Sequence, residues 1–178
     1  NEKNHYNECE HFRRYYLAYY LIDKDTNKSI RILERLVEDT NNPEHILMLL
    51  HAYLANHHEA SNITLIRKAL SEVKQSAKAQ WSDIPSYPLP WISGVMHAYL
   101  TINDISSMRE TWKLLSSAQK FLPQLLAPYC ELLLKHKFVK EADIAFSAYI
   151  KFLGQYEALS DELAKINDSI MNALAKES

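Results

Sequence analysis

Glycine is scarce in this chain, with Gly94 and Gly154 the only two among 178 residues. Phosphate-binding loops and tight hairpins need backbone positions with positive φ, which glycine supplies most easily. The shortage therefore argues against glycine-rich nucleotide sites and most α/β enzyme scaffolds, whereas an all-helical chain needs few glycines. The hydrophobic share of 47% is sufficient for a buried core, so the composition predicts a folded domain rather than a disordered segment.

The sequence also lacks an excess of charge of one sign and long apolar runs. The 20 basic and 22 acidic side chains are interspersed and give a formal net charge of −2, so we expect no binding to nucleic acid. No apolar run reaches the roughly 18 residues that cross a bilayer, so we expect no membrane insertion. Cys9 and Cys130 have no disulfide-framework spacing, which favours the cytoplasm, with the periplasm as the alternative. The start has neither an initiator Met nor a signal peptide, which predicts a fragment of a longer protein.

Apolar residues recur at steps of three and four in nine segments, which predicts nine helices. The first is expected over 5–22, the second from a Thr26 or Asn27 cap to about residue 38, the third over 43–56, and the fourth from a Ser61 cap to about residue 80. Prolines break the segment 82–90, which predicts an extended connector. Pro90 opens the fifth helix and Pro123 the seventh, and a single sixth helix carries Met108 to Phe121. The eighth helix carries Ala142, Phe146, Tyr149 and Ile150 and ends near Gly154. The ninth has one apolar face, as a terminal cap needs.

A four-residue motif occurs twice, as His51-Ala52-Tyr53-Leu54 and as His97-Ala98-Tyr99-Leu100. Weaker matches to this motif lie around Tyr20 and Leu133. If Tyr20, Tyr53, Tyr99 and Leu133 are taken as equivalent positions, successive positions are separated by 33, 46 and 34 residues. A repeat near 34 residues is the length of one helix-turn-helix unit of an α-solenoid. The long fourth helix and the proline-rich connector account for the 46-residue step as an insertion.

The packing residues of these units resemble those of the tetratricopeptide-repeat family over nearly the whole chain. The match is carried by three sets: Leu126, Tyr129, Cys130, Leu133, Ala142, Phe146 and Tyr149; Ile92, Val95, Met96, Tyr99, Met108 and Trp112; and Ile46, Leu49, Leu50 and Tyr53. Leu50, Met96 and Cys130 depart from the family, which usually has Gly or Ala there. The resemblance implies one domain over 1–178, an α-solenoid of about four antiparallel helix pairs plus a C-terminal capping helix. It also implies a protein-interaction scaffold with a concave groove.

Family geometry would place seven residues along that groove. They are Arg14, Leu47, His51, Ser93, His97, Glu131 and Lys135. His51 and His97 occupy the same place in successive units, so with Glu131 they could form a polar strip that binds a peptide or a helix. The alternative is that each histidine only hydrogen-bonds its neighbours along a helix wall.

Aromatic side chains suggest two further surfaces. Phe12, Tyr15, Tyr16, Tyr19 and Tyr20 recur at helical steps on the first helix, and Trp81, Tyr87 and Trp91 flank or lie in the connector. Tyr can bury its ring and keep its hydroxyl in water, which suits an interface. The other interpretation, which we prefer for the first helix, is that its rings pack into the solenoid core.

Signals for chemistry are weak. His5, Glu8 and Cys9 share one stretch and His57, His58 and Glu59 another, but neither has the ligand spacing of a zinc site, and no nucleophile motif is present. We therefore expect no metal, no cofactor and no enzyme activity. The sequence predicts a regulatory module that binds a protein or peptide partner, or alternatively a homodimerising module of a larger signalling protein. A ligand-sensing domain that uses the histidines is a third, weaker alternative.

Overall fold

The computed structural model describes residues 2–56, 62–154 and 159–177, and every regular element within these ranges is a helix. This confirms the prediction of an all-α fold. The helices form two compact units, Asn1–Trp81 and Ser82–Ser178, and the boundary falls at the start of the proline-rich connector. Across the described residues, none of the helices has both the length and the apolar character that a bilayer-spanning segment needs.

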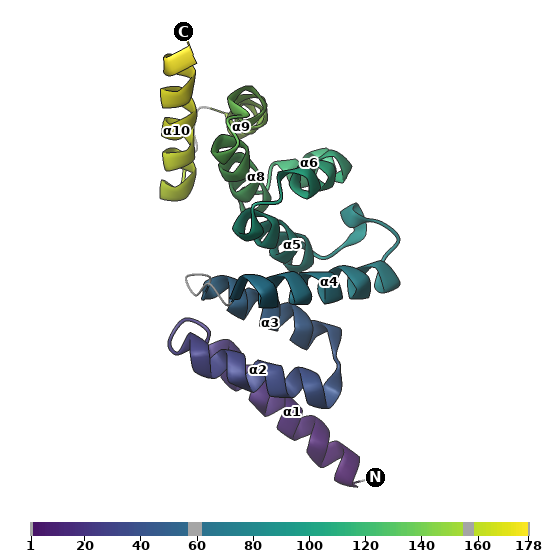
Figure 1. The fold of residues 1–178 in the computed structure, drawn as a ribbon. Coiled ribbons are helices and arrows are strands. Elements are labelled where there is room, and N and C mark those ends of the chain that lie inside the picture. The colour runs from purple at the N-terminus through teal and green to yellow at the C-terminus, as the bar shows by residue number, and fades with distance from the viewer. Residues whose placement is uncertain (1, 57–61, 155–158, 178) are drawn as a thin grey trace. The chain divides into compact units, whose positions relative to one another are not determined.

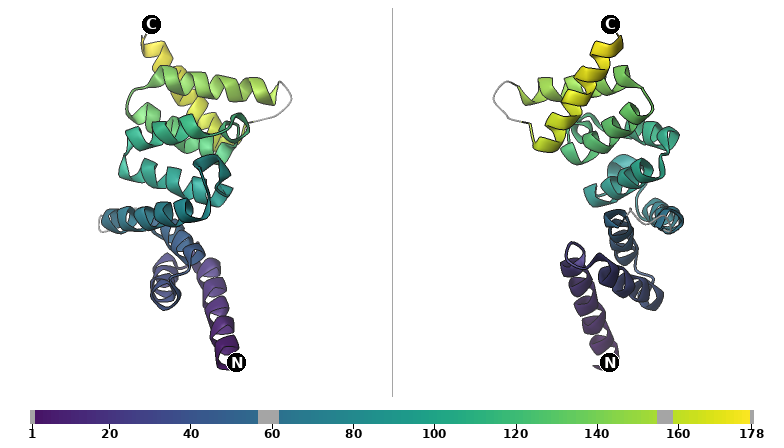
Figure 2. Two further views of the ribbon diagram at one scale, coloured as in Figure 1. Left: turned by 90° about the vertical axis from the view of Figure 1, so that its right-hand side faces the viewer. Right: turned by 60° about the vertical axis from the view of Figure 1, so that its left-hand side comes forward.

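Four helices build the first unit, and each packs on the next one in the sequence (Figures 1 and 2). They are α1 (Glu2–Leu21), α2 (Thr26–Thr40), α3 (Pro43–Ala55) and α4 (Asn62–Gln80). Their core is built from aliphatic side chains at helical spacing, namely Leu33, Leu36, Leu50, Ile66, Leu70 and Val73. Because α3 packs on both α2 and α4, it is apolar on more than one side, as a helix covered by two neighbours must be.

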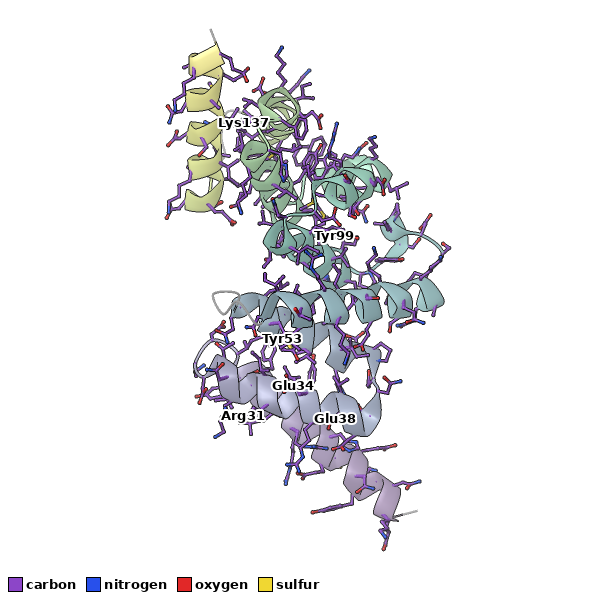
Figure 3. All side chains as sticks on the ribbon, viewed as in Figure 1. Arg31, Glu34, Glu38, Tyr53, Tyr99 and Lys137 are labelled. Carbon is purple, nitrogen blue, oxygen red and sulfur yellow. The ribbon has the colours of Figure 1, made fainter. Side chains whose placement is uncertain are left out.

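Side-chain hydrogen bonds fix the helix starts and the pairing in the first unit. Pro43 is the first residue of α3, as predicted, and the side chain of Asn42 accepts from the N–H of Glu44. The cap of α2 is Asp25 rather than Thr26 or Asn27, because its carboxylate accepts from the N–H of Lys28. The expected Ser61 cap of α4 lies outside the described residues. Between α3 and α2, the hydroxyl of Tyr53 donates to Glu34 at 2.7 Å, and the two residues lie side by side in Figure 3.

Helix α8 is the centre of the second unit, since α5, α6, α7, α9 and α10 all pack on it. The elements are the 3-10 helix η1 (Ile84–Ser86), α5 (Leu89–Ile102), α6 (Ile105–Leu114), α7 (Ser117–Lys120), α8 (Pro123–Lys135), α9 (Val139–Leu153) and α10 (Asp161–Glu177). Leu125, Leu126, Cys130, Leu132 and Leu133 of α8 are fully buried. The core of this unit therefore lies around a single helix.

The expected single helix over Met108–Phe121 is wrong, because α6 ends at Leu114 and α7 begins afresh at Ser117. Ser116 caps α7 through a capping box, in which its hydroxyl accepts from the N–H of Gln119 and the Gln119 side chain accepts from the N–H of Ser116. The amide nitrogen of Gln119 also donates to the carbonyl of Pro85 at 2.9 Å. One side chain thus joins α7 to the connector.

The ends of the last helices follow the sequence signals. Gly154 caps α9 with φ +72° and ψ −173°, a region that is essentially restricted to glycine. Ala142, Phe146 and Tyr149 of α9 are buried, whereas Ile150 is 38% exposed. Helix α10 packs on α8 and α9 and buries Leu163, Ile166 and Ile170 of its apolar face. A regular solenoid of four helix pairs remains a prediction from the resemblance.

Candidate functional site

Helix α1 is held on its unit by a small set of contacts near its C-terminal half. Ala18 is its only buried residue, and the buried hydroxyl of Ser29 on α2 donates to the carbonyl of Ala18 at 2.7 Å. A salt bridge of 2.8 Å joins the guanidinium of Arg14 to Asp39 of α2. The ring of Tyr15 lies 5.3 Å from the ring of His45 on α3. The attachment therefore uses a narrow side of the helix, around Ala18.

The other side of α1 is aromatic and faces solvent. Its members are Tyr6, Phe12, Tyr16, Tyr19 and Tyr20, which are 56–71% exposed, and we call this surface the α1 aromatic face. Leu17, 45% exposed, lies beside it, and the rings of Phe12 and Tyr16 are 4.6 Å apart. In both Figures 1 and 2 the N-terminal part of α1 extends past the other helices of its unit.

The preferred interpretation that these rings pack into the core is therefore wrong for all of them except Tyr15. Tyr15 is half-buried against α3, and burial is the main cause that raises the pKa of its hydroxyl, with the nearby carboxylate of Glu44 adding to it. It belongs to the attachment of α1 rather than to the exposed face. Tyr6 was not predicted as part of this surface, although the sequence carries a signal for it. Tyr6, Arg13, Leu17 and Tyr20 follow one another at steps of seven, four and three, which places all four on one side of the helix.

The predicted groove residues of the first unit do not form an open strip. Leu47 is 5% exposed, which contradicts its assignment to a surface groove, because α3 is covered by helices on both sides. Arg14 is half-buried and its guanidinium is engaged by Asp39. His51 is half-buried on α3. Binding of a peptide along this row would require displacement of existing contacts.

In the second unit, four predicted groove residues come close together on α5 and α8. The Nδ1 of His97 lies 2.8 Å from the carbonyl oxygen of Ser93, one turn earlier, so His97 forms the helix-wall hydrogen bond that was considered as an alternative. Burial raises the pKa of Glu131, and the charge of Glu162 adds to this, whereas Lys135 and His97 oppose it. These opposing effects show that His97 and Lys135 are within electrostatic reach of Glu131.

A hollow of about 630 Å³ lies beside this strip, between α8 and α10. It is lined by Glu131, Leu134, Lys135, Glu162, Lys165, Ile166 and Ser169. Acidic and basic side chains alternate in it, so it has no dominant charge. The hollow can accept a polar chain segment, but nothing in it selects one class of ligand.

The three aromatic residues in or beside the proline-rich connector differ in how far they are buried. Trp81 and Tyr87 are half-buried, but Trp91 is 2% exposed at the start of α5, so its assignment as an exposed interface residue is wrong. It lies in the first turn of α5, where Ile92 and Val95 are buried as well. The indole is used for packing because α5 is largely apolar around its whole circumference.

Comparisons with protein-family models, with curated proteins and with solved structures found no match. The resemblance to tetratricopeptide repeats therefore rests on the packing residues alone.

Metal-binding side chains are not gathered in the described residues. His5, Glu8 and Cys9 are exposed on α1 and line a shallow surface hollow together with Tyr6 and Phe12. Within residues 2–56, 62–154 and 159–177, no group of three or more His, Cys, Asp or Glu side chains is arranged to hold a metal ion. The second stretch considered, His57, His58 and Glu59, lies outside the described residues.

Proposed function

We propose that this chain is a non-catalytic protein-interaction module that binds a helix of a partner protein on the α1 aromatic face. The carrying observation is that α1 exposes five aromatic side chains and buries only Ala18. Exposed aromatic patches of this kind mark interaction sites, and aromatic anchors supply most of the binding energy at protein interfaces. Full burial of one such side chain is worth about 1.5–3 kcal/mol, so two or three anchors support a specific complex.

The spacing of side chains on the exposed side of α1 supports a helix as the occupant. His5, Cys9, Phe12, Tyr16 and Tyr19 follow one another at steps of four, three, four and three, and all five are exposed. This is the 3.5-residue period of a seam that packs against a second helix. Strand addition of an extended peptide to a sheet edge has no place here, because the described residues contain no strand.

A second copy of the same chain is the alternative source of that helix. The first ten residues are acidic, because they contain Glu2, Glu8 and Glu10 and only one lysine. Arg13, a basic residue, comes next along α1 and is exposed. An antiparallel pair of α1 helices brings the arginine of each copy toward the acidic end of the other, which favours self-association at low salt. In this form the protein would act as a homodimerising module.

The experiment compares the wild-type protein with a Tyr16→Ser/Tyr19→Ser variant and with a control, Met171→Ser, whose side chain is 58% exposed on α10. Sedimentation velocity up to millimolar concentration measures self-association. Dimers that the double variant loses and the control keeps would support the second copy, whereas dimers that persist in the double variant would contradict the role of this face.

If all three proteins are monomeric, a photo-crosslinking phenylalanine analogue at position 16 tests the partner form in cells. A cross-linked protein captured from position 16 and not from position 171 supports the proposal. Equal capture from both positions, or none from position 16, contradicts it. Circular dichroism of the double variant confirms that α1 keeps its helix, because both tyrosines are exposed and make few packing contacts.

A further inference from the structure

The second unit carries an aromatic pocket that no part of the proposed function uses. The pocket has a volume of about 330 Å³ and lies between α6, α7, α8 and α9. Its lining includes the stacked rings of Trp112 and Tyr129, 4.0 Å apart, together with Phe121. Ile144, Ala145 and Ala148 of α9 form the opposite wall. This volume is at the lower end for ligand sites, which suits one ring or one branched side chain rather than a nucleotide.

The charges at the pocket are unequal. Glu141 lines it, but its carboxylate accepts a hydrogen bond of 2.6 Å from the guanidinium of Arg109 and is thereby neutralised. Lys120 also lines it, with its ammonium 5.9 Å from the centre of the Trp112 ring, and no carboxylate among the described residues forms an ion pair with it. Tyr129 carries no charge at neutral pH, and burial raises its pKa further, from 10.0 to about 12. The remaining unpaired charge is therefore positive.

An exposed apolar stripe continues from the pocket along α9. Ile144 and Phe152 are 70% and 62% exposed, Ala148 lies between them, and the ring of Phe152 stacks on Phe121 of the pocket at 4.5 Å. Eight residues of helix span about 12 Å. A free small molecule would fill the pocket and leave this stripe in water, whereas a peptide can cover both.

We propose that this pocket and stripe bind an amphipathic helical peptide, with an aromatic or branched anchor in the pocket, a second apolar residue on Phe152, and an acidic side chain facing Lys120. The observations that carry the proposal are the pocket, the apolar stripe in line with it, and the unpaired lysine at its edge. The site lies entirely within the second unit, so it does not depend on the α1 aromatic face.

The probe is a fluorescein-labelled 14-residue helical peptide with Phe and Leu eight positions apart and a Glu one turn from the Phe, measured by fluorescence polarisation. A peptide with Gln in place of Glu tests the charge, and 3-phenylpropionate tests whether the pocket alone suffices. We expect the Glu peptide to bind at least tenfold more tightly than 3-phenylpropionate, and about threefold more tightly than the Gln peptide at low salt.

Two matched pairs of variants locate the site. Ala148→Arg fills the pocket and should weaken the peptide at least tenfold, whereas Ser147→Arg, the neighbouring exposed residue outside the pocket, should change the affinity less than twofold. Lys120→Glu should weaken the Glu peptide and not the Gln peptide, and Lys113→Glu on α6 should have no such selectivity. Absence of binding at millimolar peptide, equal affinity for 3-phenylpropionate, or equal effects of the two arginine variants would overturn the proposal.

Discussion

Cys130 offers a direct test of how tightly the second unit is packed around α8. Its thiol is fully buried, and burial raises its pKa to about 12 from an ordinary value of 9.0. At pH 8 the thiolate fraction is then about 10⁻⁴ in the folded protein, against about 10⁻¹ for a thiol with the ordinary value. Because the thiolate is the nucleophile, alkylation of Cys130 should be at least about 1,000-fold slower than in the unfolded chain, while the exposed Cys9 reacts freely.

The perturbation is Leu133→Ala, which removes a fully buried side chain from the same helix. Such truncations cost about 2–5 kcal/mol, so a loss of 3 kcal/mol raises the population of opened molecules about 150-fold. Alkylation of Cys130 by iodoacetamide should accelerate by this factor in the regime where opening and closing are fast. Phe138→Ala is the control, because its ring is 37% exposed, and we expect it to change the rate several-fold at most.

The assay is time-resolved alkylation followed by peptide mass spectrometry, which reports the two cysteines separately. Equal labelling rates for Cys9 and Cys130 in the wild-type protein would refute the assigned burial of α8. A Cys130 rate that is the same in the Leu133→Ala variant as in the wild type would refute the claim that packing around α8 limits access to the thiol.

Three further predictions concern substitutions of single residues and their effect on stability. In urea titrations, Glu131→Gln should raise the free energy of unfolding at pH 7 and have no such effect below pH 4. Burial raises the pKa of the Glu131 carboxyl above its ordinary value of 4.5, so the folded protein binds the proton more tightly than the unfolded chain does. The wild-type protein therefore loses stability as the pH rises above that value, and the glutamine variant does not. Ser29→Ala should cost about 1 kcal/mol by the same measurement, since it removes the buried hydrogen bond to Ala18; an unchanged midpoint would contradict the assigned role of that bond in holding α1. Gly154→Ala should cost about 1–3 kcal/mol in the same titrations. The loss comes from backbone strain alone, because φ is +72° and a Cβ there meets no atom within 4 Å; a neutral Gly154→Ala would contradict this.

Helix existence was predictable from the sequence, because proline, glycine and apolar spacing act locally. Pro43 and Pro123 each open a helix and Gly154 closes one, where the residue types alone place them. The break between α6 and α7 was also predictable in principle, since Ser116 and Gln119 form a capping-box signature three residues apart. There the apolar periodicity of Met108, Trp112, Leu115 and Phe121 was given more weight than the cap.

The side of each helix that becomes surface was harder to predict. On α1 the aromatic residues were expected to pack into the core between the first helices, but the packing side is set by Ala18, whose small side chain allows close approach to α2. The family register assigned Leu47 of α3 to a groove, and Trp91 was expected at the surface as part of the proline-rich connector. Both are buried, since α3 and α5 are apolar on several sides. Periodicity cannot distinguish a helix with one neighbour from a helix with two.

The side chain of Gln119 has a consequence for which substitutions the chain tolerates. Its oxygen accepts from the N–H of Ser116 while its nitrogen donates to the carbonyl of Pro85, so the residue must offer one acceptor and one donor at the same time. Glutamate serves equally well in an ordinary capping box, but here it would set a carboxylate oxygen against a carbonyl oxygen and release the proline-rich segment from α7. Related chains that keep this segment docked should therefore retain the amide and reject the acid, a one-atom difference that distinguishes a structural anchor from a generic helix start.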